Sequence, residues 1–186
     1  MTDLFIKNMV CNRCISVVRE TLLKLNLDVA DVQLGKVILL NTNVDKNSIQ
    51  QALKQHGFEL LEDKSQQLVN RVKLFIIGFV QIEKRHLQKF NLSQLIEREI
   101  GKDYNYISNV FSEMENITIE KYYIFQKIEK VKELLIYGEL SLNEIADIIN
   151  YSSAAHLSNQ FKDVTGFTPT QFRKLKNNNR KSLDEV

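Results

Sequence analysis

The stretch Ser141 to Lys174, SLNEIADIINYSSAAHLSNQFKDVTGFTPTQFRK, decides the fold of the C-terminal half of the chain. It starts with a short helical pattern, passes through a polar break, and continues with a second pattern in which Leu157 and Phe161 share one helix face. Gly166 ends this second helix, and Thr168-Pro169 supplies an N-cap followed by proline at the first position of another helix. Two short helices joined by a tight break are typical of a helix-turn-helix unit.

The chain contains a second copy of this unit, 50 residues earlier. Tyr106 to Phe111 (YISNVF) matches His156 to Phe161 (HLSNQF), and the helix before each match is also similar, with Leu92 and Leu95 corresponding to Leu142 and Ile145. Between the copies, Ile117 to Leu135 has a continuous helical pattern. The sequence therefore predicts two helix-turn-helix units separated by a rigid spacer helix.

Residues 91–176 resemble the DNA-binding domain of the AraC/XylS regulators in the order of their segments, LSQLIEREIG, YISNVF, TIEKYYIFQKIEKVKELL, LSLNEIADIINY and HLSNQFKDVTGFTPTQFRK. The most specific part is Ser141 to Lys174, which carries the closing motif F-x-x-x-x-G-x-T-P-x-x-F-R. The resemblance implies that Asp103 to Glu113 and Ser153 to Val164 are recognition helices, inserted into major-groove segments roughly 34 Å apart.

The candidate DNA-contacting residues lie off the apolar stripe of each recognition helix or follow the last one. They are Tyr104, Asn105, Ser108, Asn109, Ser112, Ser153, His156, Ser158, Asn159, Lys162, Arg173 and Lys174. Asn pairs with adenine, and Lys reaches guanine or phosphate. The alternative is that several of these side chains face solvent or cap a helix, and that His156 is a packing residue.

The chain departs from the family pattern at three places. Lys127 stands where the spacer helix usually has arginine, and Asn116 stands where a glycine usually turns the chain. Both are tolerable, since Asn adopts the left-handed conformation comparatively well. Glu113 and Glu115, beside the first recognition helix, would repel phosphates. We therefore expect the second unit to contribute more of the affinity for DNA.

The first 63 residues alternate short β-branched runs with helical patterns in the order βαββαβ. The segments are Leu4 to Lys7, Cys14 to Leu25, Val29 to Gln33, Lys36 to Asn41, Asn47 to His56 and Phe58 to Leu61. Gly35 suits a hairpin turn, and Gly57 suits a left-handed helix end. The pattern predicts a ferredoxin-like sandwich over residues 1–63, and hence an α+β chain.

Residues 64–90 are predicted to be a connecting helix, with apolar residues at helical spacing: Val69, Val72, Ile76, Val80, Leu87 and Phe90. It either packs on a neighbouring domain or serves as a dimerisation helix. Residues 177–186 change from basic to acidic and are expected to be a disordered tail.

Cys11 and Cys14 form a close pair after the first predicted strand, near a helix N-terminus, which favours thiolates. With the βαββαβ order, Met9-Val10-Cys11-Asn12-Arg13-Cys14 resembles the metal loop of the heavy-metal-associated domain, which implies Cu(I) or another soft metal ion as ligand. Asn8 replaces the glycine usual before the methionine, and Phe58 is expected to be a core residue. A redox-sensing dithiol, or a domain that has lost its metal and only dimerises or binds another ligand, are the alternatives. Zinc would need further ligands, for example from a second subunit.

The composition, with 44% hydrophobic and 26% charged residues, is that of an ordinary globular protein. No apolar stretch is long enough to cross a membrane, and the N-terminus does not resemble a signal peptide, so a cytoplasmic location is expected. Residues 91–186 contain 12 Lys or Arg against 14 Asp or Glu, which argues against indiscriminate charge-driven binding. No catalytic motif is found, and the histidines have no metal-ligand spacing, so no enzyme is expected.

These patterns predict a transcription regulator that binds double-stranded DNA in the major groove and senses a soft metal or a thiol redox state at Cys11 and Cys14. The alternative is a cytoplasmic metal carrier whose helical part is a docking module. A homodimer and a contact with RNA polymerase are further partnerships compatible with the sequence, whereas no membrane partner is expected.

Overall fold

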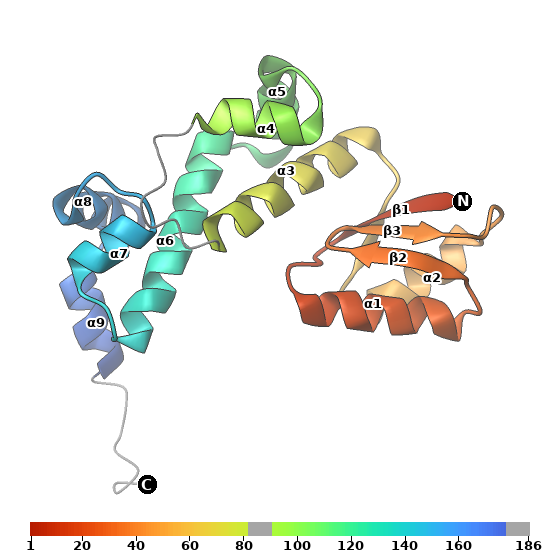
Figure 1. Cartoon of the computed structure of the whole chain (residues 1–186), viewed down its shortest axis with the longest axis horizontal. Helices are drawn as coiled ribbons and strands as arrows, with labels where there is room; N and C mark the ends of the chain where they lie inside the picture. Colours follow the sequence, from red (N-terminus) through yellow and green to blue (C-terminus); the bar gives the residue numbers. More distant parts are fainter. Residues whose placement is uncertain (82–90, 178–186) are drawn as a thin grey trace, which may run out of the picture. The chain divides into compact units, whose positions relative to one another are not determined.

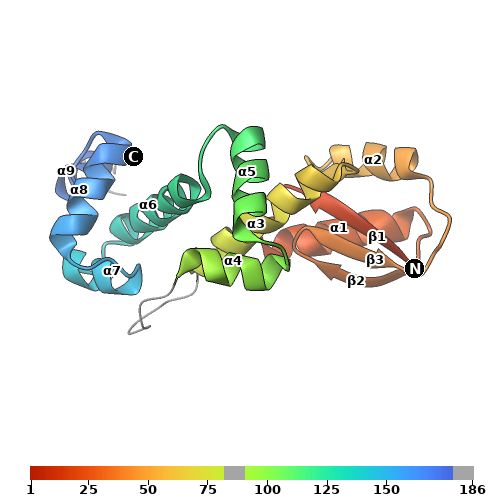
Figure 2. The ribbon, with the colours of Figure 1, turned by 90° about the horizontal axis from the view of Figure 1, so that it is seen from above.

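The structure, a computed structural model, describes residues 1–81 and 91–177 (Figures 1 and 2). The described residues form β1 (Thr2–Lys7), α1 (Asn12–Lys24), β2 (Val29–Gln33), β3 (Lys36–Leu39), α2 (Lys46–Lys54), β4 (Glu59–Leu61), α3 (Lys64–Gln81), α4 (Leu92–Ile100), α5 (Tyr104–Glu115), α6 (Ile119–Tyr137), α7 (Leu142–Ile148), α8 (Ala154–Thr165) and α9 (Pro169–Asn177). The chain divides into two compact units, residues 1–77 with 93–116 and residues 78–92 with 117–186. This division separates α5 from α6, and so cuts the predicted DNA-binding segment.

In the first unit the strands form an antiparallel sheet in the order β2-β3-β1-β4. Successive side chains of a strand point to opposite faces. Leu4 and Ile6 of β1 therefore share one face with Val37 and Leu39 of β3, and this face forms a buried core with α1 and α2. The βαββαβ order predicted from the sequence is confirmed, and the small sheet is consistent with the predicted ferredoxin-like sandwich.

The turn between β2 and β3 requires glycine for two independent reasons. Gly35 has a φ of +76°, in the left-handed region that other residues rarely adopt. A Cβ atom at this position would also lie 2.2 Å from Cδ1 of Leu74 and 3.1 Å from Nδ2 of Asn70, both on α3. The predicted hairpin glycine is thus confirmed, and it also allows α3 to approach the turn.

Helix α3 is attached to the sheet through Asn70, a buried polar residue whose Nδ2 donates to the backbone oxygen of Ile6 over 3.3 Å. Its apolar stripe is buried as predicted at Val69, Val72, Ile76 and Val80. These contacts favour the interpretation that the helix packs within its own chain. Leu87 and Phe90, with the rest of the predicted connecting helix at residues 82–90, lie outside the described residues.

The helical segments confirm the two predicted helix-turn-helix units. In each, a short helix, α4 or α7, is followed by a break and a second helix, α5 or α8. The spacer helix α6 begins and ends slightly later than the predicted Ile117 to Leu135, because Thr118 caps its N-terminus and Gly138 ends it in a left-handed conformation. Helix α9 continues to Asn177, the first residue of the predicted tail, and residues 178–186 lie outside the described part.

The last helix starts as the sequence predicts. Thr168 and Gln171 cap it reciprocally: the Gln171 backbone N–H donates to Oγ1 of Thr168, and the Thr168 backbone N–H donates to Oε1 of Gln171. Pro169 occupies the first helical position, where its missing N–H is not needed. Within the described residues, no helix is both long enough and apolar enough to span a membrane.

Replacing Gly35 by Ala should destabilise the chain more than replacing Gly57 by Ala. Both glycines are left-handed, but a Cβ at Gly57 meets no atom within 4 Å. G57A should therefore cost only the left-handed penalty of about 1–2 kcal/mol, whereas G35A adds the clash with Leu74. Urea unfolding of the full chain measures both. The added cost should shrink in a G35A/L74A background, and equal losses in G35A and G57A would contradict the close approach of α3.

Candidate nucleic-acid interface

Helix α5 presents a polar face because its apolar residues are completely buried on the other side. Ile107 and Phe111 have no exposed surface. Among the predicted contact residues, Asn105 and Asn109 are exposed and Tyr104, Ser108 and Ser112 are half-buried. Asp103 caps the helix by accepting from the backbone N–H groups of Asn105 at 2.9 Å and Tyr106 at 3.2 Å, so the helix begins one residue after the predicted Asp103.

Helix α8 is arranged in the same way. Leu157 and Phe161 are completely buried, and the predicted residues His156, Asn159 and Lys162 are exposed while Ser158 is half-buried. The helix starts after the predicted Ser153, whose hydroxyl accepts from the His156 backbone N–H at 3.1 Å and serves as the N-cap. This bond engages the Ser153 hydroxyl, as the capping alternative anticipated.

The His156 ring contacts two neighbours of its own chain. Its Nδ1 atom is 3.0 Å from the hydroxyl oxygen of Ser152, and its ring meets that of Tyr151 edge-on with centroids 5.3 Å apart. Because His156 is nevertheless exposed, its other ring edge is open to a partner. The structure thus confirms packing contacts for His156, and a contact with DNA stays a prediction.

The structure adds two candidates for DNA contact, Tyr106 and Lys102, that the sequence interpretation missed. Tyr106 on α5 is 50% exposed although it is aromatic, and Lys102 lies 5.4 Å from the centre of its ring. The residue at the matching position of α8 is His156, which the sequence interpretation did include. The repeat itself could therefore have identified Tyr106, whereas the contact with Lys102 depends on the fold.

Arg173 makes a structural contact that was not expected of a phosphate-binding residue. Its guanidinium donates to the backbone oxygen of Leu140 at 2.5 Å, and its side chain is half-buried. Phe172, beside it, meets the ring of Phe161 edge-on with centroids 5.5 Å apart. These two contacts fix α9 in the second unit. Lys174 is exposed, as a phosphate contact requires.

Of the two acidic residues expected to repel phosphates, one is paired. The Glu115 carboxylate lies 2.5 Å from the ammonium of Lys73 on α3, and both side chains are about three-quarters covered. Glu113 is exposed. The repulsive charge at this end of α5 is therefore smaller than the sequence indicated.

Lys127 of α6 is a buried cation, only 8% exposed, in the core of the second unit. Its ammonium lies 3.5 Å from the ring centre of Tyr151 and 5.5 Å from that of Tyr123. Burial lowers the pKa of Lys127 to about 8, and the ring contacts oppose part of this effect because they stabilise the charged form. Burial also raises the pKa of Tyr123 to about 12.

The two cysteines lie together at the start of α1. Cys11 is its exposed N-cap residue, Cys14 is half-buried, and their sulfur atoms are 3.5 Å apart. Hydrogen bonds from the backbone and thiol of Cys14 hold the pKa of Cys11 below its ordinary value, with smaller contributions from Arg13. The lowered pKa favours the thiolate form of Cys11, whereas metal binding and redox sensing by the pair stay predictions.

The residues around the cysteine pair have clear structural roles. Asn8 has a φ of +72°, which explains how it replaces glycine there, and its Nδ2 donates to the Gly57 backbone oxygen at 2.9 Å. Met9 is completely buried and Phe58 is 7% exposed, so both belong to the core of the first unit. The expectation that Phe58 is a core residue is confirmed.

Comparison with known proteins matches the helical half of the chain. A family model described as a helix-turn-helix domain matches residues 96–175. The Msm operon regulatory protein of Streptococcus mutans is 27% identical over 84 residues, 45% of this chain and 30% of that protein. AdaA of Bacillus subtilis, a bifunctional transcriptional activator and DNA repair enzyme, is 27% identical over 94 residues, 50% of this chain and 44% of that protein. The chain thus spans less than half the length of either relative.

A solved structure shows the same fold. It is a transcriptional regulator from Chromobacterium violaceum, described as one of the proteins with an AraC-type DNA-binding domain. The two structures align with a TM-score of 0.53 and 17% sequence identity, and the alignment covers 62% of this chain and 97% of that chain.

The free energy of unfolding should increase as the pH rises above about 8, because Lys127 loses its proton in the folded chain. Below the lowered pKa of the folded state, Lys127 carries its full burial penalty. Between about pH 8 and the ordinary value of 10.5, the unfolded chain holds the proton more tightly than the folded chain, so folding becomes more favourable. Above about pH 10 the raised pKa of Tyr123 reverses the trend.

Urea unfolding at several pH values between 7 and 10 measures the free energy of unfolding of the wild-type chain and of K127M. The contribution of Lys127 is the difference between these two free energies at each pH. The difference should change by roughly 1–3 kcal/mol across the window. Parallel pH profiles in the two proteins would show that Lys127 is not buried in its charged form.

Proposed function

We propose that the chain is a sequence-specific DNA-binding transcription regulator of the AraC type, which the helix-turn-helix match over residues 96–175 and the similar fold of the Chromobacterium violaceum regulator support. The observation that carries the proposal is the shared architecture of α5 and α8. Each helix buries two apolar residues four positions apart and presents a polar face with an exposed asparagine, Asn109 or Asn159. Such a face offers the donors and acceptors that read base edges in the major groove.

The two regulatory relatives, an operon regulator and a transcriptional activator, support the regulatory part of the proposal. In this account α5 and α8 enter major-groove segments about one helical turn, roughly 34 Å, apart. Residues 91–176 are the DNA-binding segment, residues 1–63 the sensing domain and residues 64–90 the connection between them. A homodimer and a contact with RNA polymerase stay predictions.

The second helix-turn-helix unit should contribute more affinity than the first. Helix α8 presents Lys162 and Asp163 beside Asn159, whereas at the matching positions α5 presents the neutral Ser112 and Glu113 beside Asn109. An exposed carboxylate near DNA opposes phosphate binding, and an exposed ammonium assists it. The ion pair of Glu115 with Lys73 reduces this disadvantage of the first unit without removing it.

Asn159→Ala should weaken binding to a duplex selected by the wild-type chain by about tenfold or more, because it removes a base contact. Asn109→Ala should have a smaller effect, and Asn47→Ala, an exposed asparagine on α2, serves as the matched control with no effect. Fluorescence anisotropy over a salt series measures the affinities. Equal losses for Asn109 and Asn159 would contradict the unequal roles, and no loss for either would contradict readout by these helices.

The cysteine pair supports an added sensing role, through a soft metal such as Cu(I) or through thiol redox state. Two cysteine sulfur atoms 3.5 Å apart, with a lowered pKa at Cys11, suit an ion that accepts two sulfur ligands. Within the described residues there is no cluster of three or more His, Cys, Asp or Glu side chains, so the ligand set suits Cu(I) better than tetrahedral zinc. Cys11 and Cys14 would hold the ion at the N-terminus of α1, where the net negative charge of a Cu(I) ion with two thiolates suits the helix dipole.

A Cu(I) titration tests this role in the wild-type chain and in a C11S/C14S variant. Competition with a coloured chelator should show one Cu(I) per wild-type chain and none in the variant. Operator affinity should then change with Cu(I) only in the wild type, since a ligand shifts a conformational equilibrium only by binding one state more tightly. Identical DNA affinities in all three samples would contradict sensing. Cu(I) transfer without sequence-dependent DNA binding would favour the metal-carrier alternative.

A further inference from the structure

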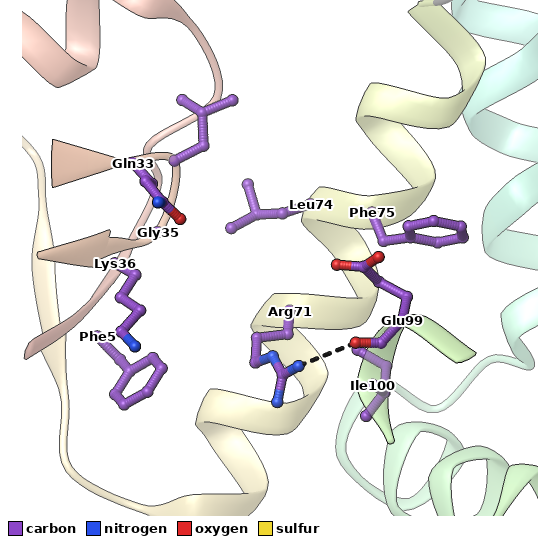
Figure 3. Close-up of a pocket in the computed structure, with 10 residues that line it drawn as sticks. Phe5, Gln33, Gly35, Lys36, Arg71, Leu74, Phe75, Glu99 and Ile100 are labelled. Atoms are coloured by element: carbon purple, nitrogen blue, oxygen red, sulfur yellow. Dashed lines mark hydrogen bonds between the residues drawn. The ribbon is translucent and has the colours of Figure 1, made fainter. Parts of the chain in front are cut away.

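The first unit contains a cavity of about 480 Å³ bounded by three different elements. The sheet contributes Phe5, Gly35 and Lys36, helix α3 contributes Arg71 and Leu74, and helix α4 contributes Glu99 (Figure 3). Its volume lies in the range of pockets that bind small molecules, roughly 300–1,000 Å³. None of its lining residues belongs to the exposed faces of α5 and α8 or to the cysteine pair.

The walls of the cavity are fixed by polar contacts on both sides of α3. Asn70 donates to the backbone oxygen of Ile6 at 3.3 Å, and Arg71 donates to the backbone oxygen of Glu99 at 3.2 Å. Between these contacts Leu74 extends toward Gly35, where a glycine leaves room for it (Figure 3). The cavity is therefore a feature of the packing of α3.

Two cations and two apolar side chains define its chemistry. Lys36 and Arg71 line the cavity, and among the described residues Arg71 has no carboxylate partner, so its remaining guanidinium donors are available. Lys36 lies 2.7 Å from an Asp3 carboxylate oxygen and 5.8 Å from the ring centre of Phe5, which leaves further ammonium donors free.

Charge favours an anionic ligand. The carboxylate of Glu99 extends toward Phe75, on the side of the cavity away from Lys36 and Phe5 (Figure 3). The region between Lys36 and Arg71 thus holds one cation paired with Asp3 and one without a carboxylate partner among the described residues, with the apolar surfaces of Phe5 and Leu74 beside it. We propose that this cavity binds a small organic anion, with its charged group between Lys36 and Arg71 and its apolar body on Phe5 and Leu74.

Such a ligand would contact the sheet and α3 directly, and it would reach α4 through the bond between Arg71 and the Glu99 backbone. Because α4 is the first helix of the first helix-turn-helix unit, the ligand couples the sheet to that unit within one compact body. An effect on DNA affinity rests on the proposed function and requires different ligand affinities in the two states of the chain. The binding site itself does not depend on DNA, so its test uses none.

Titration of the full chain with the fluorescent probe anilinonaphthalene sulfonate tests the site. This probe combines an apolar ring system with a negatively charged sulfonate. R71Q and K36Q should each weaken binding by about tenfold, because each removes one charge-assisted contact. E99Q should bind the probe as tightly as the wild type or more tightly. R98Q removes an exposed arginine from α4 outside the cavity and should leave the affinity unchanged.

Two further arms distinguish this site from general hydrophobic binding. Benzoate should displace the probe from the wild-type chain, and benzyl alcohol at equal concentration should not. L74W, which fills the cavity, should abolish binding while circular dichroism shows an intact fold; the charge variants keep the test valid if it does not fold. Any one of three results would overturn the proposal. They are equal probe binding by R71Q, K36Q and R98Q, equal displacement of the probe by benzyl alcohol and benzoate, and no probe binding by the wild-type chain.

Discussion

The two helix-turn-helix units depend on one constraint, the burial of two apolar side chains one helical turn apart in each second helix. No surface is exposed on either pair, Ile107 with Phe111 and Leu157 with Phe161. The burial of each phenylalanine contributes on the order of 3 kcal/mol or more to the free energy of unfolding. Because these residues fix the rotation of α5 and α8 about their own axes, the opposite faces are held toward solvent. Asn109 and Asn159 are exposed as a consequence of this packing.

Within the first unit, α3 connects the features on which regulation would depend. Asn70 bonds to the sheet, Arg71 to α4, and Lys73 to Glu115 at the end of α5. These contacts use neighbouring positions of one helix. A change at the sheet therefore has a direct physical route to the first helix-turn-helix unit, and the cavity beside Arg71 lies on that route.

Local sequence signals predicted much of the fold. Gly35, Gly166 and the Thr168-Pro169 start of α9 depend on backbone conformation alone, so residue type was sufficient. The repeat located both α5 and α8, although their caps and bounds needed small corrections. In contrast, the Lys73 to Glu115 pair, the Arg173 bond to Leu140 and the burial of Lys127 join distant segments, and no local pattern encodes such contacts.

The central claim is that α5 and α8 both read duplex DNA. Base-by-base interference mapping on a duplex selected by the wild-type chain tests it most directly, because it detects major-groove contacts individually. The account predicts two clusters of interfering bases on one face of the duplex, about one helical turn or 10 base pairs apart. The cluster assigned to α8 should disappear in Asn159→Ala. A single cluster, or interference confined to phosphates, would contradict the claim.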